Sequence, residues 1–556
     1  MCTVERQAPS LSSTSRRARS VPRAWLLAAA SAIAASFLTI APDPRVLAQA
    51  PEPTMTHPDL AVRTVVTGLD SPTTMAFIGR NDMLVLEKNT GKVQRVVNGK
   101  IQSTVLDLAV NFGSERGLLG IALHPRFPRN PGVYLYWTES STGADTNVLA
   151  ETPLLGNRVD RFEWSGSALV QDINLIRLRA IQQDATNPVE RGNHNGGVLA
   201  FQISGDDKDW RDRNAREDDD GNWRWWASDS GPGNGNGSDN GRGNGNGNDR
   251  RSRDKAKLLI FMGDNGRRGQ MQNLVDGPFG PGQADDQFGG PEPDDAHLTG
   301  VVLRLNDDGT TPQDNPFYDY GASVGGEVGA NLQKVFAFGF RNSFGIAVDP
   351  RSGDLWTQEN GDDSFSEINR VEPGTNCGWV QIMGPIARLA EFKGIETSAA
   401  FFGLQQVRWL PTLIADTPAE ALARLNVLPE SKYSDPEFSW KFEVAPAGIG
   451  FVESRALGRE FAGDLFVGAS RPTLAGGYLF RFNLSDDRRG VNVSADPRLA
   501  DRVADNVAKF EITESESLLI GMNFGVGTDI ETGPNGNVYV VSLSNGAIYE
   551  IYRRRR

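Results

Sequence analysis

Hydrophobic residues in this chain fall into short runs separated by turns rich in glycine, proline, asparagine and aspartate, and continuous helical periodicity is scarce. Runs of this kind predict β-strands joined by tight turns. The 61 glycines favour the same interpretation, because tight turns often need a residue that tolerates a positive φ angle. The pattern therefore predicts an all-β protein.

One strand pattern recurs along the chain. An apolar strand ends near an aspartate or proline and a glycine turn, and a second strand, a polar loop and a third strand follow. Clear copies span residues 71–97, 344–371 and 529–552, and looser copies begin at Gly117, Gly196 and Gly448. Because a unit of three or four strands cannot bury its faces alone, the repeats predict a six-bladed β-propeller over residues 60–553. A two-layered sandwich is the alternative fold, but it does not explain the repeat.

Two segments interrupt this repeat. Residues 206–257 are charged and then rich in glycine and asparagine, a composition that buries too little apolar surface to offset its ordering entropy. They are predicted to form a disordered loop insertion. Residues 384–435 contain helical stretches such as 418–425, and we expect them to form a partly helical cap beside the site.

The N-terminal segment has the pattern of a secretory signal. Arginines at positions 16, 17, 19 and 23 precede an apolar run at residues 24–40, and small-residue patterns follow at 46–50. A signal peptide over residues 1–48 is predicted, because the apolar run is short and a cleavage pattern follows it. An uncleaved anchor is the alternative. We expect a periplasmic or secreted protein without a membrane span once the signal is removed.

Charge and cysteine content narrow the possible partners. The formal net charge of −13 argues against nucleic acid, since phosphate binding needs a basic surface, and it is compatible with bound divalent cations. Cys2 lies within the predicted signal, which leaves Cys377 without an intramolecular disulfide partner.

One histidine and one aspartate are the strongest candidates for chemistry. His194 lies in the glycine-rich segment RGNHNGG, directly before the strand VLAF, and Asp264 follows the apolar strand LLIFM. An aspartate that fixes the tautomer of a histidine is the usual way to build a general base near neutral pH. The alternative is a pair of turn-forming polar residues. His57, His124 and His297 are predicted to be structural or solvated.

Several ordered motifs together resemble one family. They are ERGLLGIALHPRF, NHNGG, LLIFMGDNG, LTGVVLRLNDDG, FAFGFRNSFGIAVDP, QENGDDSFSEINRV with NCGW, and GDLFVGAS. Over about residues 64–552 the chain resembles the soluble quinoprotein glucose and aldose sugar dehydrogenases, the glucose/sorbosone dehydrogenase family. This resemblance implies a six-bladed propeller. It also implies oxidation of the C1 hydroxyl of an aldose to a lactone with pyrroloquinoline quinone (PQQ) and Ca²⁺, and electron transfer to an external acceptor.

The resemblance also assigns roles to residues. It implies that His194 is the general base, that Asp264 orients it, and that Arg341 lies near the quinone carbonyl. Cofactor contacts are implied for Glu115, Asn193, Asn342, Trp440 and Arg471. Carbonyl groups of Gly361 and Asp362 would bind the calcium that touches PQQ, and Glu367 would bind a second, structural calcium.

The chain departs from the family pattern at the cofactor clamp. Glu115 stands where the family has a quinone-binding glutamine, and residues 526–529 read VGTD where the family has R-x-R-D. Losing two arginine contacts to the PQQ carboxylates weakens binding at roughly 1.5–3 kcal/mol per charged hydrogen bond, and Arg471 would compensate only in part. Two alternatives therefore stay open: a calcium-dependent propeller lactonase or hydrolase, and a non-catalytic propeller that binds carbohydrate or protein.

Overall fold

Strands dominate the protein, as the hydrophobic pattern predicts. The structure is a computed structural model that describes residues 51–181, 192–202, 216–217, 223–224, 255–266, 271, 273, 298–398, 411–470 and 476–555. Residues 50–556 form one unit, which is considered by itself here. The predicted signal peptide lies outside the described residues. Within them, no helix combines the length and the hydrophobicity that crossing a bilayer requires.

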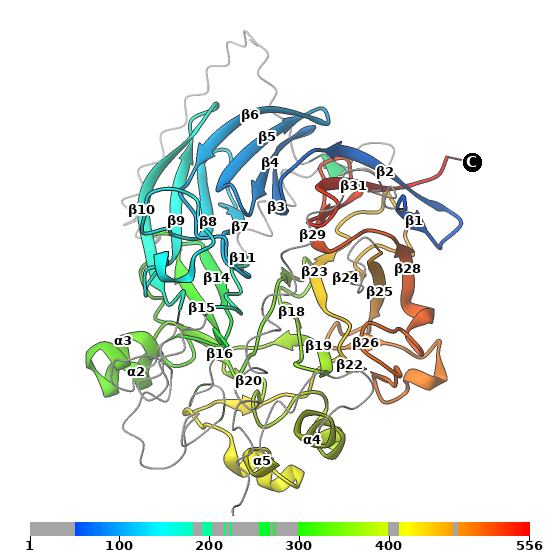
Figure 1. Cartoon of the computed structure of the whole chain (residues 1–556). Helices are drawn as coiled ribbons and strands as arrows, with labels where there is room; N and C mark the ends of the chain where they lie inside the picture. The colour runs from blue at the N-terminus through cyan, green and yellow to red at the C-terminus, as the bar shows by residue number, and fades with distance from the viewer. Residues whose placement is uncertain are drawn as a thin grey trace, which may run out of the picture. The chain divides into compact units, whose positions relative to one another are not determined.

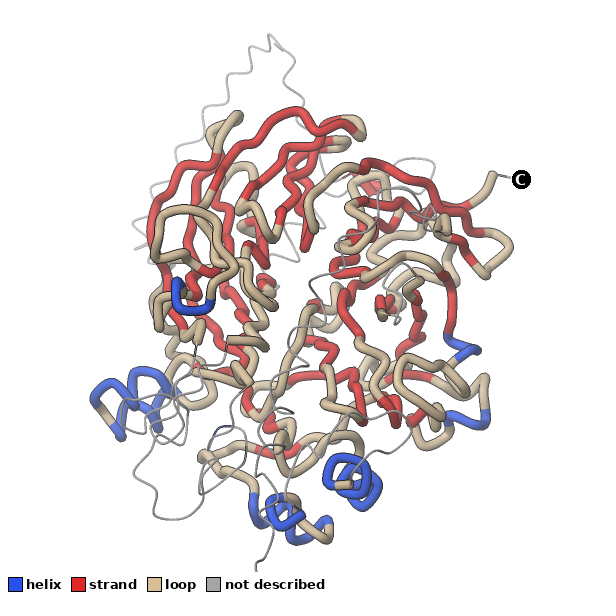
Figure 2. The backbone as a smooth tube through the Cα atoms, in the orientation of Figure 1, coloured by secondary structure: helices blue, strands red, loops and turns tan. Residues whose placement is uncertain are grey.

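Three sheets come mainly from the N-terminal part of this unit (Figures 1 and 2). The first contains β3 (Pro72–Gly79), β4 (Asp82–Glu87), β5 (Lys92–Val97) and β6 (Lys100–Asp107). The second contains β7 (Leu118–Leu123), β8 (Gly132–Thr138), β9 (Asn157–Trp164) and β10 (Leu169–Leu178). The third contains β11 (Leu199–Gln202), β14 (Lys257–Met262), β15 (Val301–Asn306), β16 (Val335–Phe338), β20 (Thr375–Asn376) and β21 (Lys432–Tyr433).

The remaining large sheets come mainly from the C-terminal part. One contains β17 (Ile346–Val348), β18 (Leu355–Glu359), β19 (Ser364–Val371), β22 (Phe438–Phe442) and β27 (Val503–Ala504). The next contains β23 (Pro446–Phe451), β24 (Leu465–Ala469), β25 (Tyr478–Leu484), β26 (Val491–Asn492), β28 (Leu519–Met522) and β1 (Thr54–Met55). The last contains β29 (Gly527–Thr532), β30 (Val538–Ser542), β31 (Ala547–Arg553) and β2 (Leu60–Thr67).

The innermost strands of these sheets contact one another in sequence. β3 contacts β7, β7 contacts β11, and the series continues through β17, β23 and β29 back to β3. The closing sheet joins both ends of the described chain, because β2 pairs antiparallel with β31. This arrangement confirms the predicted all-β propeller architecture.

Hydrophobic side chains fill the space between neighbouring sheets. Trp356, Trp440, Phe480 and Phe482 belong to one buried cluster, and comparable clusters lie between the other sheets. Burying each such side chain contributes about 1.5–3 kcal/mol, so contact between neighbouring sheets is the main source of stability. The repeat therefore folds because each sheet buries the face of the next.

Helices occur only at the margins of the described propeller. They are α2 (Tyr318–Val324), α3 (Gly326–Leu332), α4 (Leu389–Thr397) and α5 (Pro418–Arg424), with 3-10 turns η1 (Leu149–Glu151), η3 (Ile386–Arg388), η4 (Pro411–Leu413), η5 (Pro497–Leu499) and η6 (Glu516–Leu518). The helix predicted at residues 418–425 is confirmed by α5. The Thr417 hydroxyl accepts the Glu420 N–H at 3.2 Å, and Pro418 suits the first turn.

Three short parts of residues 206–257, the segment predicted to be a disordered insertion, are described, and the disorder of the insertion stays a prediction. β12 (Arg216–Glu217) pairs with β13 (Trp223–Arg224), Lys255 and Ala256 have defined positions, and β14 already begins at Lys257. Lys257 pairs with Asn306 of β15, so pairing with a neighbouring strand outweighs its polar side chain. The other residues of the insertion lie outside the described part of the chain.

Candidate functional site

His194 and Asp264 form a hydrogen-bonded pair, as the sequence predicts. The histidine Nδ1 lies 2.7 Å from the aspartate Oδ1. Asp264 is the second residue after β14, and its backbone N–H donates to the Arg341 carbonyl at 2.8 Å. Because the Asp264 carboxylate accepts a hydrogen bond from Nδ1, the imidazole carries its proton on Nδ1. Nε2 is therefore free of a proton and can accept one from a substrate.

Two further contacts hold the aspartate in place. The Trp379 indole N–H donates to Asp264 Oδ2 at 3.0 Å, and the Gly266 N–H donates to Oδ1 at 2.7 Å. The Asp264 side chain is almost fully buried, whereas that of His194 is 12% exposed. The imidazole therefore stays accessible while its orienting carboxylate does not. The NCGW motif by itself does not indicate this role of Trp379, because the contact with Asp264 spans 115 positions of the chain.

Glu115 fixes the backbone of the histidine loop. Its Oε2 accepts the His194 N–H at 2.6 Å and the Asn342 side-chain amide at 3.0 Å. His194 has a φ of 57°, a left-handed conformation that needs support in a residue with a Cβ. Glu115 thus lies beside His194, and its contacts connect two loops that are distant in sequence. Asn193 is half-buried beside Gly266.

Arg341 is buried, and its guanidinium is held by other protein groups. Its Nε and Nη2 donate to Asp362 Oδ1 at 3.0 and 2.7 Å, and Nη1 donates to the Asn360 carbonyl at 2.8 Å. Burial opposes the charged form, but the nearby carboxylates, led by Asp362, more than offset it and raise the pKa of Arg341. A permanent positive charge therefore lies directly behind Asp264.

Lys509 binds the acidic loop that contains Asp362 and Asp363. Its Nζ donates to the Asp362 carbonyl at 3.2 Å, to Asp363 Oδ1 at 2.8 Å and to Glu443 Oε2 at 2.6 Å. The Asp362 carbonyl, an oxygen for which calcium binding is predicted, thus already accepts one hydrogen bond, and calcium binding at Gly361 and Asp362 stays a prediction. Only glycine fits at position 361, since a Cβ there would lie 1.8 Å from the Ser364 carbonyl oxygen. No feature of the local sequence around Lys509 indicated this role.

Glu359 and Glu367 form a buried pair of carboxylates on neighbouring strands. They are directly opposite in the β18–β19 register. Burial raises the pKa of Glu367 to about 7 and raises that of Glu359 well above its usual range. Glu359 Oε2 has no hydrogen-bond partner among the described residues, whereas Glu367 accepts from the Asn369 amide at 3.0 Å. Two such carboxylates suit a shared proton or a hard cation.

The position of Trp440 does not support its predicted role beside the quinone. The Trp440 indole is fully buried and packs edge-on against Phe438, with ring centroids 4.9 Å apart. An indole without exposed surface offers no face to a ligand, so its position does not support a role as an aromatic wall. The physical reason is its place between two sheets. Arg471 lies outside the described residues.

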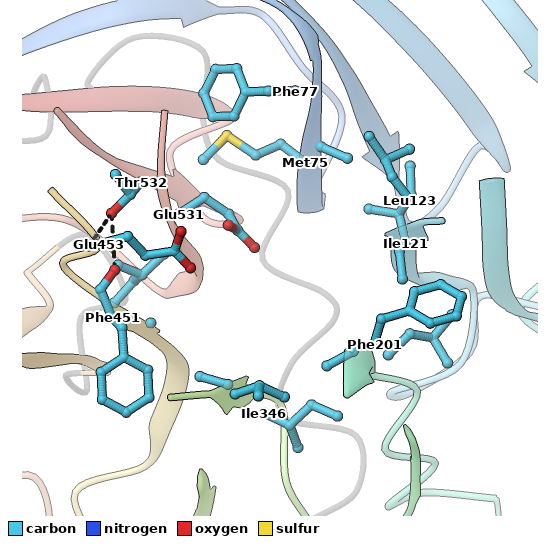
Figure 3. A pocket seen from close by; sticks show the side chains of 18 of the residues that line it. Met75, Phe77, Ile121, Leu123, Phe201, Ile346, Phe451, Glu453, Glu531 and Thr532 are labelled. Carbon is cyan, nitrogen blue, oxygen red and sulfur yellow. Dashed lines mark hydrogen bonds between the residues drawn. The ribbon is translucent and has the colours of Figure 1, made fainter. Parts of the chain in front are cut away.

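Two adjoining cavities lie among the innermost strands. The Glu115 cavity, of about 220 Å³, is lined by Lys88, Glu115, Gly196 and Thr528 among others. The Glu453 cavity, of about 340 Å³, is lined mainly by apolar side chains such as Met75 and Phe201, with the carboxylates of Glu453 and Glu531 (Figure 3). The cavities share Ile121, Leu199, Ile346, Ile449 and Glu531, so they are successive parts of one passage. The Glu115 cavity is the one next to the histidine.

Known proteins resemble this chain over much of its length. A family model described as glucose/sorbosone dehydrogenase matches residues 69–209 and 253–394, about half of the chain. The chain is 26% identical over 489 residues to aldose sugar dehydrogenase YliI of Escherichia coli K12, covering 87% of this chain and 91% of that protein. It is 24% identical over 332 residues to quinoprotein glucose dehydrogenase B of Acinetobacter calcoaceticus, covering 58% of this chain and 52% of that protein.

Solved structures show the same fold. The soluble aldose sugar dehydrogenase of Escherichia coli in its apo form aligns with a TM-score of 0.52 at 20% identity, covering 89% of this chain and 100% of that chain. At this identity the likeness bears on the fold alone.

Proposed function

We propose that this chain, which belongs to the glucose/sorbosone dehydrogenase family, oxidises the C1 hydroxyl of an aldose sugar to the lactone. The observation that carries the proposal is the His194–Asp264 pair at 2.7 Å, placed beside a cavity and supported by Trp379. The reaction removes one proton and one hydride from the sugar. An external acceptor then takes up the electrons.

His194 has the geometry of the base in this reaction. Nε2 would take the C1 hydroxyl proton, and Asp264 would stabilise the imidazolium that forms. Glu115 holds the His194 backbone, so the ring keeps its direction during proton transfer. Arg341 supplies a fixed positive charge next to the pair, which suits a site where negative charge develops on an acceptor.

The family cofactor PQQ fits the described residues in part. When bound, PQQ would supply the two-electron acceptor for the hydride from C1. Asn342 Oδ1 is buried and lacks a partner among the described residues, and Lys88 is available to one carboxylate. Glu115 and Asp529 add negative charge to the same cavity. We therefore expect Asn342, Lys88 and the undescribed Arg471 to hold the cofactor, with a weaker affinity than a complete arginine clamp would give.

The contacts favour Glu359 and Glu367 over Asp362 as calcium ligands in this proposal. A buried carboxylate pair with one unpartnered oxygen is a donor set that Ca²⁺ accepts, whereas Lys509 already binds the Asp362 carbonyl. We propose a structural calcium at the glutamate pair. Other oxygen donors would have to complete it, since about six to eight ligands are usual.

Two wider proposals complete this interpretation. We propose six blades, one for each sheet of four or more strands among the described residues, supported by the closed series of inner-strand contacts. We also propose that residues 1–48 direct export and are removed, supported by the arginine-rich, apolar pattern of the N-terminus. Mass determination of the mature protein from the periplasm or medium tests the second proposal.

The test of function is a titration of the purified mature protein with PQQ in excess Ca²⁺ and again in EDTA. Dye reduction by glucose and other aldoses is followed together with binding. Saturable binding and sugar-dependent dye reduction are expected, with a loss of about 10²–10⁴-fold in kcat in His194→Ala. His57→Ala, far along the chain from this pair, serves as the matched control and should keep its kcat.

Other results would contradict the proposal. Absence of PQQ binding up to ~100 μM would correspond to a binding free energy weaker than about −5.5 kcal/mol. It would mean that the chain does not bind PQQ without the missing arginines. Lactone hydrolysis without quinone would favour the propeller hydrolase. Absence of both activities would favour a non-catalytic binding protein.

A further inference from the structure

Lys88 is the one lysine or arginine among the described side chains that line the Glu115 cavity. It directly follows the last residue of β4, at the end of the strand that leads to the cavity. The other charged side chains described in this lining are the carboxylates of Glu115, Asp529 and Glu531. A negatively charged ligand that enters this cavity therefore meets one described positive charge.

The surrounding backbone fixes the position of Lys88. Its N–H donates to the Ser71 carbonyl at 3.1 Å, and its carbonyl accepts the Leu118 N–H at 3.1 Å. Gly117, with a φ of 134°, packs directly against it. A Cβ at Gly117 would lie 2.4 Å from the Lys88 carbonyl oxygen and 2.8 Å from its Cγ. The lysine stem therefore passes through a space that only a glycine neighbour leaves open.

The ammonium group is only partly satisfied by the protein. Nζ donates to the Phe112 carbonyl at 2.9 Å and more weakly to Asn89 Oδ1 at 3.4 Å. In the described part of the chain, no carboxylate lies within 4.0 Å of it. Since an ammonium carries three donors, one remains for a ligand. Burial lowers the pKa of Lys88 to about 8, and an anion bound beside it would reverse that effect.

We infer that Lys88 binds a carboxylate group of the molecule that occupies the Glu115 cavity. The inference rests on the proposed function and deepens it, because two ligands of that function could bring a carboxylate group into the cavity. One source is PQQ, for which Lys88 would replace part of the missing arginine clamp. The other source is the substrate, which would then be an acidic sugar such as a uronic acid. Carboxylate recognition by a positioned ammonium is common to both.

The test compares Lys88→Met and Lys88→Arg with wild type in the full mature protein. PQQ and the redox-inert benzene-1,3,5-tricarboxylate are titrated by tryptophan fluorescence and calorimetry, and kcat/KM is measured for glucose and glucuronate. Lys88→Met should weaken binding of both tricarboxylates by about 10- to 100-fold, the loss of one charged hydrogen bond. Lys88→Arg should stay within about threefold of wild type, because it keeps the charge. The exposed Lys100 supplies the matched control, Lys100→Met.

Each outcome decides the inference. Weaker tricarboxylate binding in Lys88→Met supports it and assigns the carboxylate to the cofactor. Unchanged tricarboxylate binding with a selective loss of kcat/KM for glucuronate supports it and assigns the carboxylate to the substrate. No change in any of these readouts overturns it. If wild type binds the inert tricarboxylate through Lys88 but oxidises no sugar, the proposed function fails while the inference stands.

Discussion

At the scale of single residues, Glu115 has two separable effects. Its Oε2 accepts two hydrogen bonds that hold the histidine loop, and its side chain lines the Glu115 cavity, where we propose that an anionic cofactor binds. Glutamine can keep both acceptor contacts and remove the charge, whereas alanine removes both. The pair of substitutions therefore separates support of the loop from repulsion of the ligand.

We predict opposite outcomes for these two substitutions. Glu115→Gln should keep kcat and strengthen PQQ binding, since the repulsive charge is gone. Glu115→Ala should lower kcat, because the N–H of His194 and the Asn342 amide lose their acceptor at a cost of about 1–3 kcal/mol. Steady-state kinetics and a PQQ titration measure both. Unchanged PQQ affinity in Glu115→Gln would show that the carboxylate does not face the cofactor.

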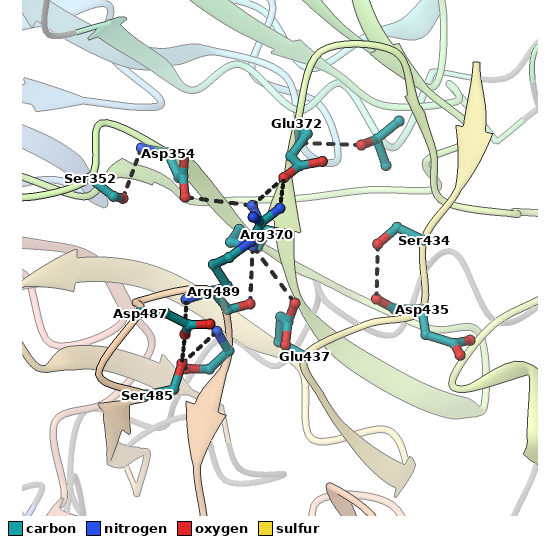
Figure 4. A network of polar contacts seen from close by, with 12 residues as sticks. Ser352, Asp354, Arg370, Glu372, Ser434, Asp435, Glu437, Ser485, Asp487 and Arg489 are labelled. Atoms are coloured by element: carbon teal, nitrogen blue, oxygen red, sulfur yellow. Dashed lines mark hydrogen bonds and ion pairs between the residues drawn. The ribbon is translucent and has the colours of Figure 1, made fainter. Parts of the chain in front are cut away.

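At the scale of elements, a network of charges joins β19 to its neighbours (Figure 4). Arg370 donates to Glu372 at 2.7 Å and to the Arg489 carbonyl at 3.0 Å. Glu372 also accepts from Lys432 at 2.5 Å and from Arg489 at 2.8 Å. The hydrogen bond from Lys432, followed by that from Arg370, lowers the pKa of Glu372 to about 2. One carboxylate thus connects β19, β21 and the loop between β25 and β26.

This lowered pKa predicts a pH dependence of stability. The contribution of Glu372 is present above its ordinary pKa of 4.5 and is lost as the pH falls toward 2. At pH 6, Glu372→Gln should lower the free energy of unfolding by about 1 kcal/mol, a value reduced for solvent screening. Near pH 2.5 the difference should shrink. Urea unfolding at both pH values measures it, and Glu163→Gln at an exposed position is the control. A difference that stays constant with pH would contradict the prediction.

At the scale of the whole unit, closure depends on β2 and β31. Arg63 and Glu550 pair across these strands at 2.7 Å, and Ile551 of β31 is fully buried in the cluster that also contains Leu60. Arg63 and Glu550 are 487 positions apart in the chain. Because the ring has no free edge only when these strands pair, local damage here should affect the whole unit.

We predict that Ile551→Ala destabilises the protein by about 2–5 kcal/mol, through loss of buried surface and the cavity that remains. The matched control is Ile101→Ala on β6, since that side chain is 41% exposed. It should change stability by less than about 0.5 kcal/mol. Calorimetry should show the main transition itself shifted to lower temperature in Ile551→Ala. An unshifted main transition would mean that closure does not control the stability of the unit.

The sequence by itself determined the strands, the repeat and the histidine–aspartate pair. Alternation of apolar runs and turns is a local property, so the pattern predicts strands without knowledge of their neighbours. His194 and Asp264 each lie at a strand end within a glycine-rich segment, and repeating sheets bring such ends to one side. Helix α5 was predictable for the same reason, because proline and a capping threonine mark its start.

Only the tertiary structure decided which side chains meet across sheets. Lys509 reaches Asp363 over 146 positions, and Glu115 reaches Asn342 over 227. Trp440 is buried between sheets rather than exposed at a ligand site, and its local sequence is the same in either case. Such contacts depend on how neighbouring sheets pack and where long side chains end, and no local pattern encodes this. For that reason the histidine–aspartate pair could be predicted from sequence, while the contacts of Lys509 and the place of Lys88 in the cavity could not.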